Sequence, residues 1–266
     1  MIKDITIGQY LPGSTIIHKL DPRVKILAVT LFIITIFFIN SFWFYIPMII
    51  YISGVTSVSK TPFKYLFKGL KSLIIIILVT AFLNMFLTPG EIICSYGYIS
   101  ITKEGLILAV FMSIRLILLV MGTSLLTLTT SPISLTDALE SIFSPLKVIK
   151  FPAHELAMMM TITLRFIPTL MEETDKIMKA QMARGADFES GNMIKRAKNL
   201  VPLIIPLFLN SFRRADELAL AMESRCYHGG EGRTRLNPLK MKSKDYAIMF
   251  LLIVYFLGII IGSKLL

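Results

Sequence analysis

Two arginines with closely matched surroundings are the residues whose type and spacing suggest a specific chemistry. One stands in Ala183-Arg184-Gly185 and the other in Ser224-Arg225-Cys226, and each follows an aspartate by nine residues and an alanine by four. A guanidinium flanked by small residues is accessible, and its planar fork matches carboxylate or carbonyl groups in a pocket. Alternatively, a cation at this position stabilises the C-terminus of its own helix. The duplication favours two similar attachment points for partners.

Three further cations need an explanation. Arg23 and Lys25, in the segment Asp21-Pro22-Arg23-x-Lys25, directly precede the first long apolar run. This pattern is typical of a helix that begins at a proline, with basic residues at the level of the lipid headgroups. Arg115 is a lone charge inside another apolar run. Because a charge within a membrane is costly, it normally faces other helices or a partner protein. The sequence does not identify the group that Arg115 contacts.

The sequence contains no recognisable catalytic, metal or nucleotide motif. It has neither a P-loop, G-x-x-x-x-G-K-[ST], nor an HExxH motif. Its two cysteines, Cys94 and Cys226, form no C-x-x-C pair, and Cys226-x-His228 is an isolated pair of ligands. The basic part of the chain is poor in the aromatic residues that stack on single-stranded nucleic acid. We therefore expect no catalytic site, no metal site, no bound cofactor and no nucleic-acid partner.

The composition indicates a membrane protein. Residues of the set AVILMFWYC make up 55% of the chain and charged residues 17%, which is more apolar than a soluble domain. No charge occurs from Ile26 to Ser59. One helix over this run would be about 51 Å long, whereas the hydrocarbon core is about 30 Å thick. The polar pair Asn40-Ser41, followed by aromatic residues and Pro47, divides the run into two spans.

Three more spans are predicted, at Leu70–Thr88, Gly105–Thr130 and Tyr246–Gly262. Of the 28 Lys and Arg residues, all but Lys103, Arg115 and Lys264 lie before the first span, between spans two and three, or between spans four and five. Positive loops stay in the cytoplasm. The N-terminus is therefore expected inside and the C-terminus outside the cell.

The segment between spans four and five is too charged to cross a membrane and too apolar to be a linker. Its pattern predicts two long helices, Ala153–Ala183 and Asn192–Arg225, which end near Gly185 and Gly229. The predicted fold is an all-α polytopic membrane protein with five transmembrane helices and a helical cytoplasmic coupling domain. We assign residues 1–130 to spans one to four, 131–244 to the coupling domain and 245–266 to span five.

The chain resembles the transmembrane T components of energy-coupling factor (ECF) transporters, the EcfT/CbiQ-like family. The resemblance covers essentially the whole chain. It rests on four motifs, which are Gly8-Gln9-Tyr10, His18-Lys19-Leu20-Asp21-Pro22-Arg23-x-Lys25, Ala183-Arg184-Gly185 and Ala221-Met222-Glu223-Ser224-Arg225. Many members of this family have Ala-Arg-Gly at the second arginine, where this chain has Ser224-Arg225-Cys226.

The resemblance implies a non-catalytic coupling subunit of an ABC-type importer in the prokaryotic cell membrane. Two ABC-type ATPases, which use ATP and Mg²⁺, would dock on the two arginine motifs, and the spans would hold a small vitamin-binding S component in the bilayer. Arg115 would then contact either other spans or the S component. The alternative is a stand-alone secondary transporter or channel, a class that predicts inverted repeats and broken spans.

Overall fold

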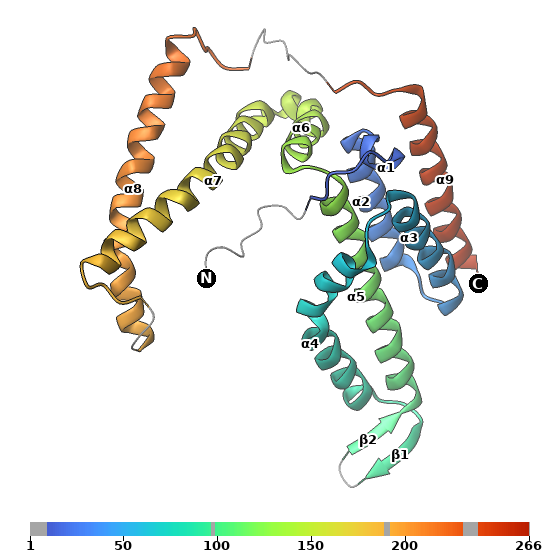
Figure 1. Ribbon diagram of the computed structural model, residues 1–266. Coiled ribbons are helices and arrows are strands. Elements are labelled where there is room, and N and C mark those ends of the chain that lie inside the picture. The colour runs from blue at the N-terminus through green and yellow to red at the C-terminus, as the bar shows by residue number, and fades with distance from the viewer. Residues whose placement is uncertain (1–9, 97–98, 189–191, 231–238, 266) are drawn as a thin grey trace. The chain divides into compact units, whose positions relative to one another are not determined.

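The computed structural model describes residues 10–96, 99–188, 192–230 and 239–265 (Figure 1). They form two compact units. The first, called here the bundle unit, comprises residues 10–138 and 239–265, and the second, the insert unit, comprises residues 139–230. The domain boundaries predicted at 130/131 and 244/245 follow span ends, and they stay predictions. Gly8 and Gln9 of the N-terminal motif lie outside the described residues.

Six α-helices and a short 3₁₀-helix form the described body of the bundle unit, and a further helix leads out of it. They are α1 (Ile16–Lys19), α2 (Pro22–Phe38), η2 (Phe42–Phe44), α3 (Tyr45–Ser59), α4 (Phe63–Leu87), α5 (Lys103–Thr129) and α9 (Ser243–Leu265), with α6 (Pro132–Phe143) leading toward the insert unit. The break predicted at Asn40-Ser41 is confirmed, since α2 ends before this pair and α3 begins after it.

Membrane-spanning length distinguishes the bundle helices. Phe42–Ser59, α5 and α9 are long and apolar enough to cross a bilayer, and α4 makes a fourth candidate if its two parts, which meet at 59°, are taken as one span. Helix α2 has 17 residues and is about 26 Å long, at the lower limit for a span. The predicted helical membrane fold is confirmed, while the number of five spans stays a prediction.

The connection between α4 and α5 contains two short strands that the all-α prediction does not include. Strands β1 (Ile92–Tyr96) and β2 (Ile99–Thr102) pair in an antiparallel hairpin. Isoleucine recurs in both strands, and β-branched residues favour extended backbone. A helix-based interpretation of the apolar runs passes over such a hairpin because its strands are short.

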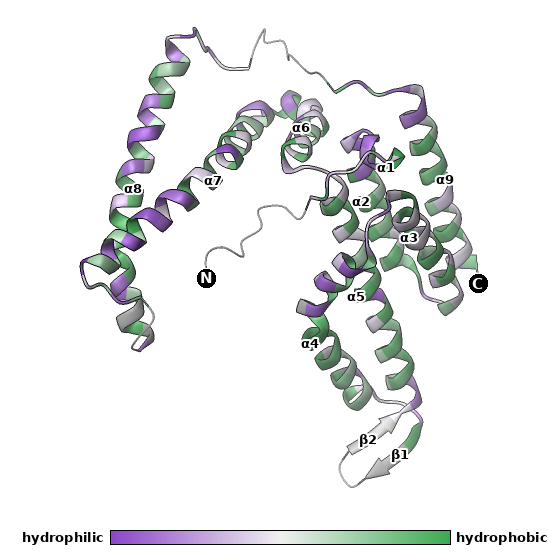
Figure 2. Ribbon diagram, in the orientation of Figure 1, coloured by the Kyte–Doolittle hydropathy of each residue, from purple (hydrophilic) through white to green (hydrophobic). Residues whose placement is uncertain are grey.

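The core of the bundle unit lies where α2, α3, α5 and α9 meet. Its buried members include Phe32, Tyr45, Met48, Leu118 and Phe256. Helices α2 and α9 run parallel, because Asp21 contacts Asp245 at their beginnings and the hydroxyl of Ser263 donates to the carbonyl of Phe38 at their ends, at 2.9 Å. Figure 2 shows that these helices are coloured as hydrophobic over most of their length.

Gly122 allows α5 to approach α2 closely. A Cβ atom at this position would lie 2.4 Å from Cε1 of Phe32, whose side chain is 1% exposed. Small residues at such crossings let membrane helices pack backbone against side chain. The close packing of α2 on α5 therefore depends on the absence of a side chain at residue 122.

The insert unit contains η3 (Ser144–Ile149) and two long helices, α7 (Ala153–Ala183) and α8 (Met193–Glu223). The predicted helices Ala153–Ala183 and Asn192–Arg225 are confirmed, the first with its bounds unchanged. The two helices cross in antiparallel directions, and Asn210 Nδ2 of α8 donates to Glu173 Oε1 of α7 at 2.7 Å. Both helices alternate hydrophilic and hydrophobic turns, unlike the bundle helices (Figure 2).

We predict that Gly122→Leu destabilises the bundle unit, whereas Gly54→Leu and Gly258→Leu do not. No atom lies within 4 Å of a Cβ built at Gly54 or Gly258, while overpacking at Gly122 should cost about 1–3 kcal/mol. Thermal unfolding of the detergent-purified chain, followed by circular dichroism, measures the difference. Equal midpoints for the three variants would contradict the packing role of Gly122.

Candidate functional site

The two arginine motifs end their helices with the same backbone hydrogen bonds. After α7, the amides of Arg184 and Ala186 donate to the carbonyl of Gln181, both at 3.0 Å, and Gly185 donates to Met182 at 2.9 Å. Gly185 has a φ of 87°, a left-handed conformation that is typical at this position. The helix end is thus closed by the backbone itself.

The end of α8 repeats this pattern with different residues. The amides of Arg225 and Tyr227 donate to the carbonyl of Met222, at 3.1 and 3.0 Å, and Cys226 donates to Glu223 at 2.9 Å. Cys226 takes the left-handed position with a φ of 57°. A side chain in this conformation costs about 1–2 kcal/mol relative to glycine. The departure from Ala-Arg-Gly therefore leaves the shape of the helix end unchanged.

Both guanidinium groups are free of partners among the described residues. Ala183, Arg184 and Gly185 are all exposed, as are Ser224, Arg225 and Cys226. The hydrogen bonds and ion pairs of the described chain include none from either arginine side chain. Backbone amides already bind the carbonyls of Gln181 and Met182 at one end and of Met222 and Glu223 at the other, so neither arginine side chain is needed to bind these carbonyls.

The two arginines lie at separate points of the insert unit. Gln181, in the last turn of α7, donates to the carbonyl of Pro202 at 3.5 Å, so the end of α7 lies beside the first half of α8. From there, α8 continues for about 35 Å to Arg225. Helix α8, which contains Pro202 and Pro206, thus separates the two matching ends, and this separation suits contact with two separate partner surfaces.

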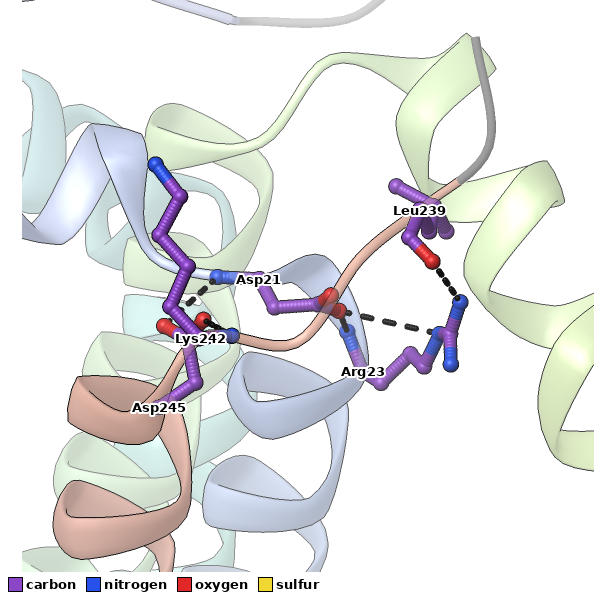
Figure 3. Close-up of polar contacts among 5 residues, drawn as sticks. All are labelled: Asp21, Arg23, Leu239, Lys242 and Asp245. Carbon is purple, nitrogen blue, oxygen red and sulfur yellow. Dashed lines mark hydrogen bonds and ion pairs between the residues drawn. The ribbon is translucent and has the colours of Figure 1, made fainter.

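The N-terminal motif forms a polar cluster at the beginning of α2 (Figure 3). Asp21 caps α2 by accepting from the amide of Arg23 at 2.9 Å, and Pro22 occupies the first helical position. The amide of Asp21 donates to Asp245 Oδ1 at 3.5 Å, and Asp245 Oδ2 accepts from the amide of Lys242 at 2.8 Å. One buried carboxylate therefore joins the beginnings of α2 and α9.

The two cations of this motif donate to backbone carbonyls on other segments. Arg23 Nη2 donates to the carbonyl of Leu239 at 3.0 Å, and its Nε lies 3.8 Å from Asp21 Oδ1. Lys25 Nζ donates to the carbonyls of His18, at 3.2 Å, and Thr129, at 2.9 Å. Lys25 is 6% exposed. The motif thus contacts residues far from it in the sequence, instead of lying only at a lipid surface.

Arg115 is held within the bundle unit. Its Nη2 donates to the carbonyl of Ile39 at 3.2 Å and its Nε to the hydroxyl of Tyr45 at 3.4 Å, while its guanidinium lies 5.0 Å from the ring centroid of Phe111. A hollow of about 460 Å³ beside it is also lined by Glu104 and Asn40. These contacts agree with the expectation that Arg115 contacts other spans. The alternative, a contact with an S component, stays a prediction.

Sequence reasoning missed three members of the polar cluster. Asp245 lies in the first turn of the helix that begins the last apolar run, where an acidic side chain often caps a helix N-terminus. The sequence therefore offered a signal for this residue. The carbonyls of Thr129 and Leu239 carry no sequence signal, because every residue has one. Among the described residues, no group of three or more His, Cys, Asp or Glu side chains is placed to hold a metal.

Comparison with known proteins gives consistent similarities. The profile of the CbiQ family, described as cobalt transport protein, matches residues 13–236. The chain is 59% identical over 248 residues to the energy-coupling factor transporter transmembrane protein EcfT of Clostridium kluyveri, covering 92% of each chain. It is 58% identical over 246 residues to the protein of the same name from Thermosediminibacter oceani, covering 92% of this chain and 93% of that one. For the Bacillus subtilis protein of this name, identity is 49% over 255 residues, with 96% of each covered.

The shared closure of the helix ends predicts opposite effects for two substitutions at Cys226. Cys226→Gly should stabilise the left-handed position, and Cys226→Val should open it, because a β-branched side chain is strained there. Hydrogen exchange of the amides of Cys226 and Tyr227 should be about tenfold faster in the valine variant than in the glycine variant. Equal exchange rates would show that the end of α8 is not closed in this way.

Proposed function

Because the chain belongs to the CbiQ family, as a transmembrane component of energy-coupling factor transporters, we propose that it couples ATP-driven motion to substrate uptake. In this proposal two ABC-type ATPases dock on the insert unit, and a small S component, which captures the substrate, binds in the membrane. The chain itself performs no chemistry. It transmits motion through contacts that differ between two states of its partners.

The observation that carries the proposal is the pair of matching helix ends. Arg184 and Arg225 follow identical backbone closures, are exposed and have no partner among the described residues. An ATPase subunit that offers a pocket of carboxylate or carbonyl groups would fit either end equally well, because a planar guanidinium forks onto such groups. Two similar ends, one on α7 and one on α8, support docking of two similar subunits.

We further propose that the insert unit and the N-terminus face the cytoplasm and the C-terminus the outside. The beginnings of α2 and α9 meet at Asp21 and Asp245, and the end of α5 meets α2 at Lys25. Helices α2 and α9 therefore cross in the same direction and α5 in the opposite one. The excess of Lys and Arg on the connecting segments supports the cytoplasmic assignment of that side.

The orientation predicts the accessibility of the free cysteine at the end of α8. Cys226 is exposed, so a membrane-impermeant maleimide should label a Cys94→Ser variant only after the cells are permeabilised. A Cys226→Ser chain that retains Cys94 serves as the reverse control for the connection between α4 and α5. Labelling of Cys226 in sealed cells would contradict the proposed orientation.

The docking hypothesis predicts that Arg184→Ala and Arg225→Ala each weaken retention of the ATPases. Loss of an arginine that donates to buried acceptors costs about 2–5 kcal/mol, whereas loss of a helix-end cation costs about 1 kcal/mol or less. The double variant should release the ATPases, and Arg→Lys should restore retention only in part. The measurement is affinity purification of the tagged chain from its own cells, with the retained ATPases quantified.

Arg213→Ala is the matched control. Arg213 is an exposed arginine within α8, away from both helix ends, and its loss should leave ATPase retention unchanged. Full retention in the double alanine variant would contradict docking through the arginines. Absence of any ATPase with the unaltered chain would instead favour the hypothesis of a stand-alone transporter or channel.

A further inference from the structure

The start of α2 contacts the end of α5, which precedes the connection to the insert unit, and Leu239, where the chain returns from that unit. The chain leaves the bundle unit within α6, which follows α5 and its last residue Thr129, and it returns at Leu239 before α9. Lys25 donates to the carbonyl of Thr129, and Arg23 donates to that of Leu239. Two cations on one turn of α2 therefore bind the end of α5, from which the outgoing segment starts, and the first residue of the returning segment.

Burial and charge balance indicate that this cluster is firmly held. The side chain of Asp21 is 4% exposed and that of Arg23 22%, and Lys25 and Asp245 are each 6% exposed as residues. Arg23 Nε lies 3.8 Å from Asp21 Oδ1, so the charges of these two side chains partly offset each other. Hydrogen bonds from a charged donor are stronger than neutral ones, and leaving a buried carbonyl unpaired is costly.

The contacts also extend to the chain that precedes α2. Lys25 Nζ donates to the carbonyl of His18, whose Nε2 is 3.1 Å from the carbonyl of Leu11, and the amide of Leu11 donates to the carbonyl of Leu128 at 2.9 Å. The last two carbonyls of α5 are therefore both bound from the N-terminal side of the chain. The end of α5 has little freedom to move independently of α2.

We propose that Arg23 and Lys25, with Asp21 and Asp245, act as a staple that makes the two connections of the insert unit move together with α2. Arg23 and Lys25 are positioning residues in this account, and they bind neither ATP nor substrate. The proposal rests on the proposed coupling function. Motion that the insert unit passes along these two connections would then reach α2, α5 and α9 as one displacement.

The alternative is that the cluster serves stability alone. The two accounts differ in the effect expected when one contact of the cluster is removed. A purely stabilising cluster, once weakened, lowers the amount of folded protein but leaves each assembled transporter equally efficient. A staple, once weakened, leaves assembled transporters that hydrolyse ATP while importing less substrate, because motion of the insert unit is lost in its connections.

The test compares Arg23→Met and Lys25→Met with Arg23→Lys and with the control Lys19→Met. Lys19 is exposed and is the last residue of α1, the helix before α2. Arg23→Lys keeps a donor for the carbonyl of Leu239. Hydrogen exchange of the amides in residues 130–136 and 240–245 of the purified chain reports the staple itself. Exchange should become about tenfold faster in the two methionine variants and stay unchanged in the control.

The second measurement uses the complex purified with its ATPases and S component in proteoliposomes. ATP hydrolysed per substrate imported should rise several-fold for Arg23→Met and return toward the unaltered ratio for Arg23→Lys. Arg23, being partly exposed, tolerates substitution better than Lys25, so this pair decides the outcome if Lys25→Met does not fold.

Unchanged hydrogen exchange in Arg23→Met would overturn the staple. Faster exchange with an unchanged ratio of ATP to substrate would overturn its role in transmitting motion and leave the stability account. If the unaltered chain bound no ATPases, the coupling function would fail, and with it the transmitting role, while the exchange measurement would still decide whether the two connections are fixed to α2.

Discussion

The bundle unit depends on the requirement that backbone carbonyls at helix ends find donors where water is scarce. Helices α2 and α5 are antiparallel, and each carries one cation that donates to the end of the other. Lys25 of α2 binds the carbonyl of Thr129, and Arg115 of α5 binds that of Ile39. The separation along each helix is the same, about 21 Å, so the two contacts fix the register of the pair.

The rest of the bundle follows from this register. Gly122 meets Phe32 between the two cations, and α9 joins α2 through Asp245 at one end and Ser263 at the other. Arg23 and Lys25 bind Leu239 and Thr129, so the chain is fixed to α2 close to both ends of the segment that contains the insert unit. Within the insert unit, the two long helices end near the exposed Arg184 and Arg225. The proposed coupling function requires both a rigid frame and accessible helix ends, which correspond to the bundle unit and to the ends of α7 and α8.

The sequence predicted the helices well and the contacts poorly, for physical reasons. Apolar runs, prolines and Gly185 mark helix bounds through local backbone preferences, so Ala153–Ala183 was predicted residue for residue. The similarity of Arg184 and Arg225 was also visible in the sequence, because both follow an aspartate and an alanine at the same spacing. The partners of Arg23, Lys25 and Arg115 were not, since they are backbone carbonyls brought near by tertiary packing. The β1–β2 hairpin was missed because the prediction considered only helices as membrane elements.

The central claim is that the two arginine helix ends are two equivalent docking points for ATPases. Site-specific photo-cross-linking tests it most directly, with a photoreactive residue at Ala183 in one chain and at Ser224 in another. The account predicts a cross-link to an ATPase subunit from each position in the assembled transporter, and none from the same residue at Arg165, which is exposed near the middle of α7. Cross-links from Ala183 and Ser224 that reach only lipid or the S component would contradict it.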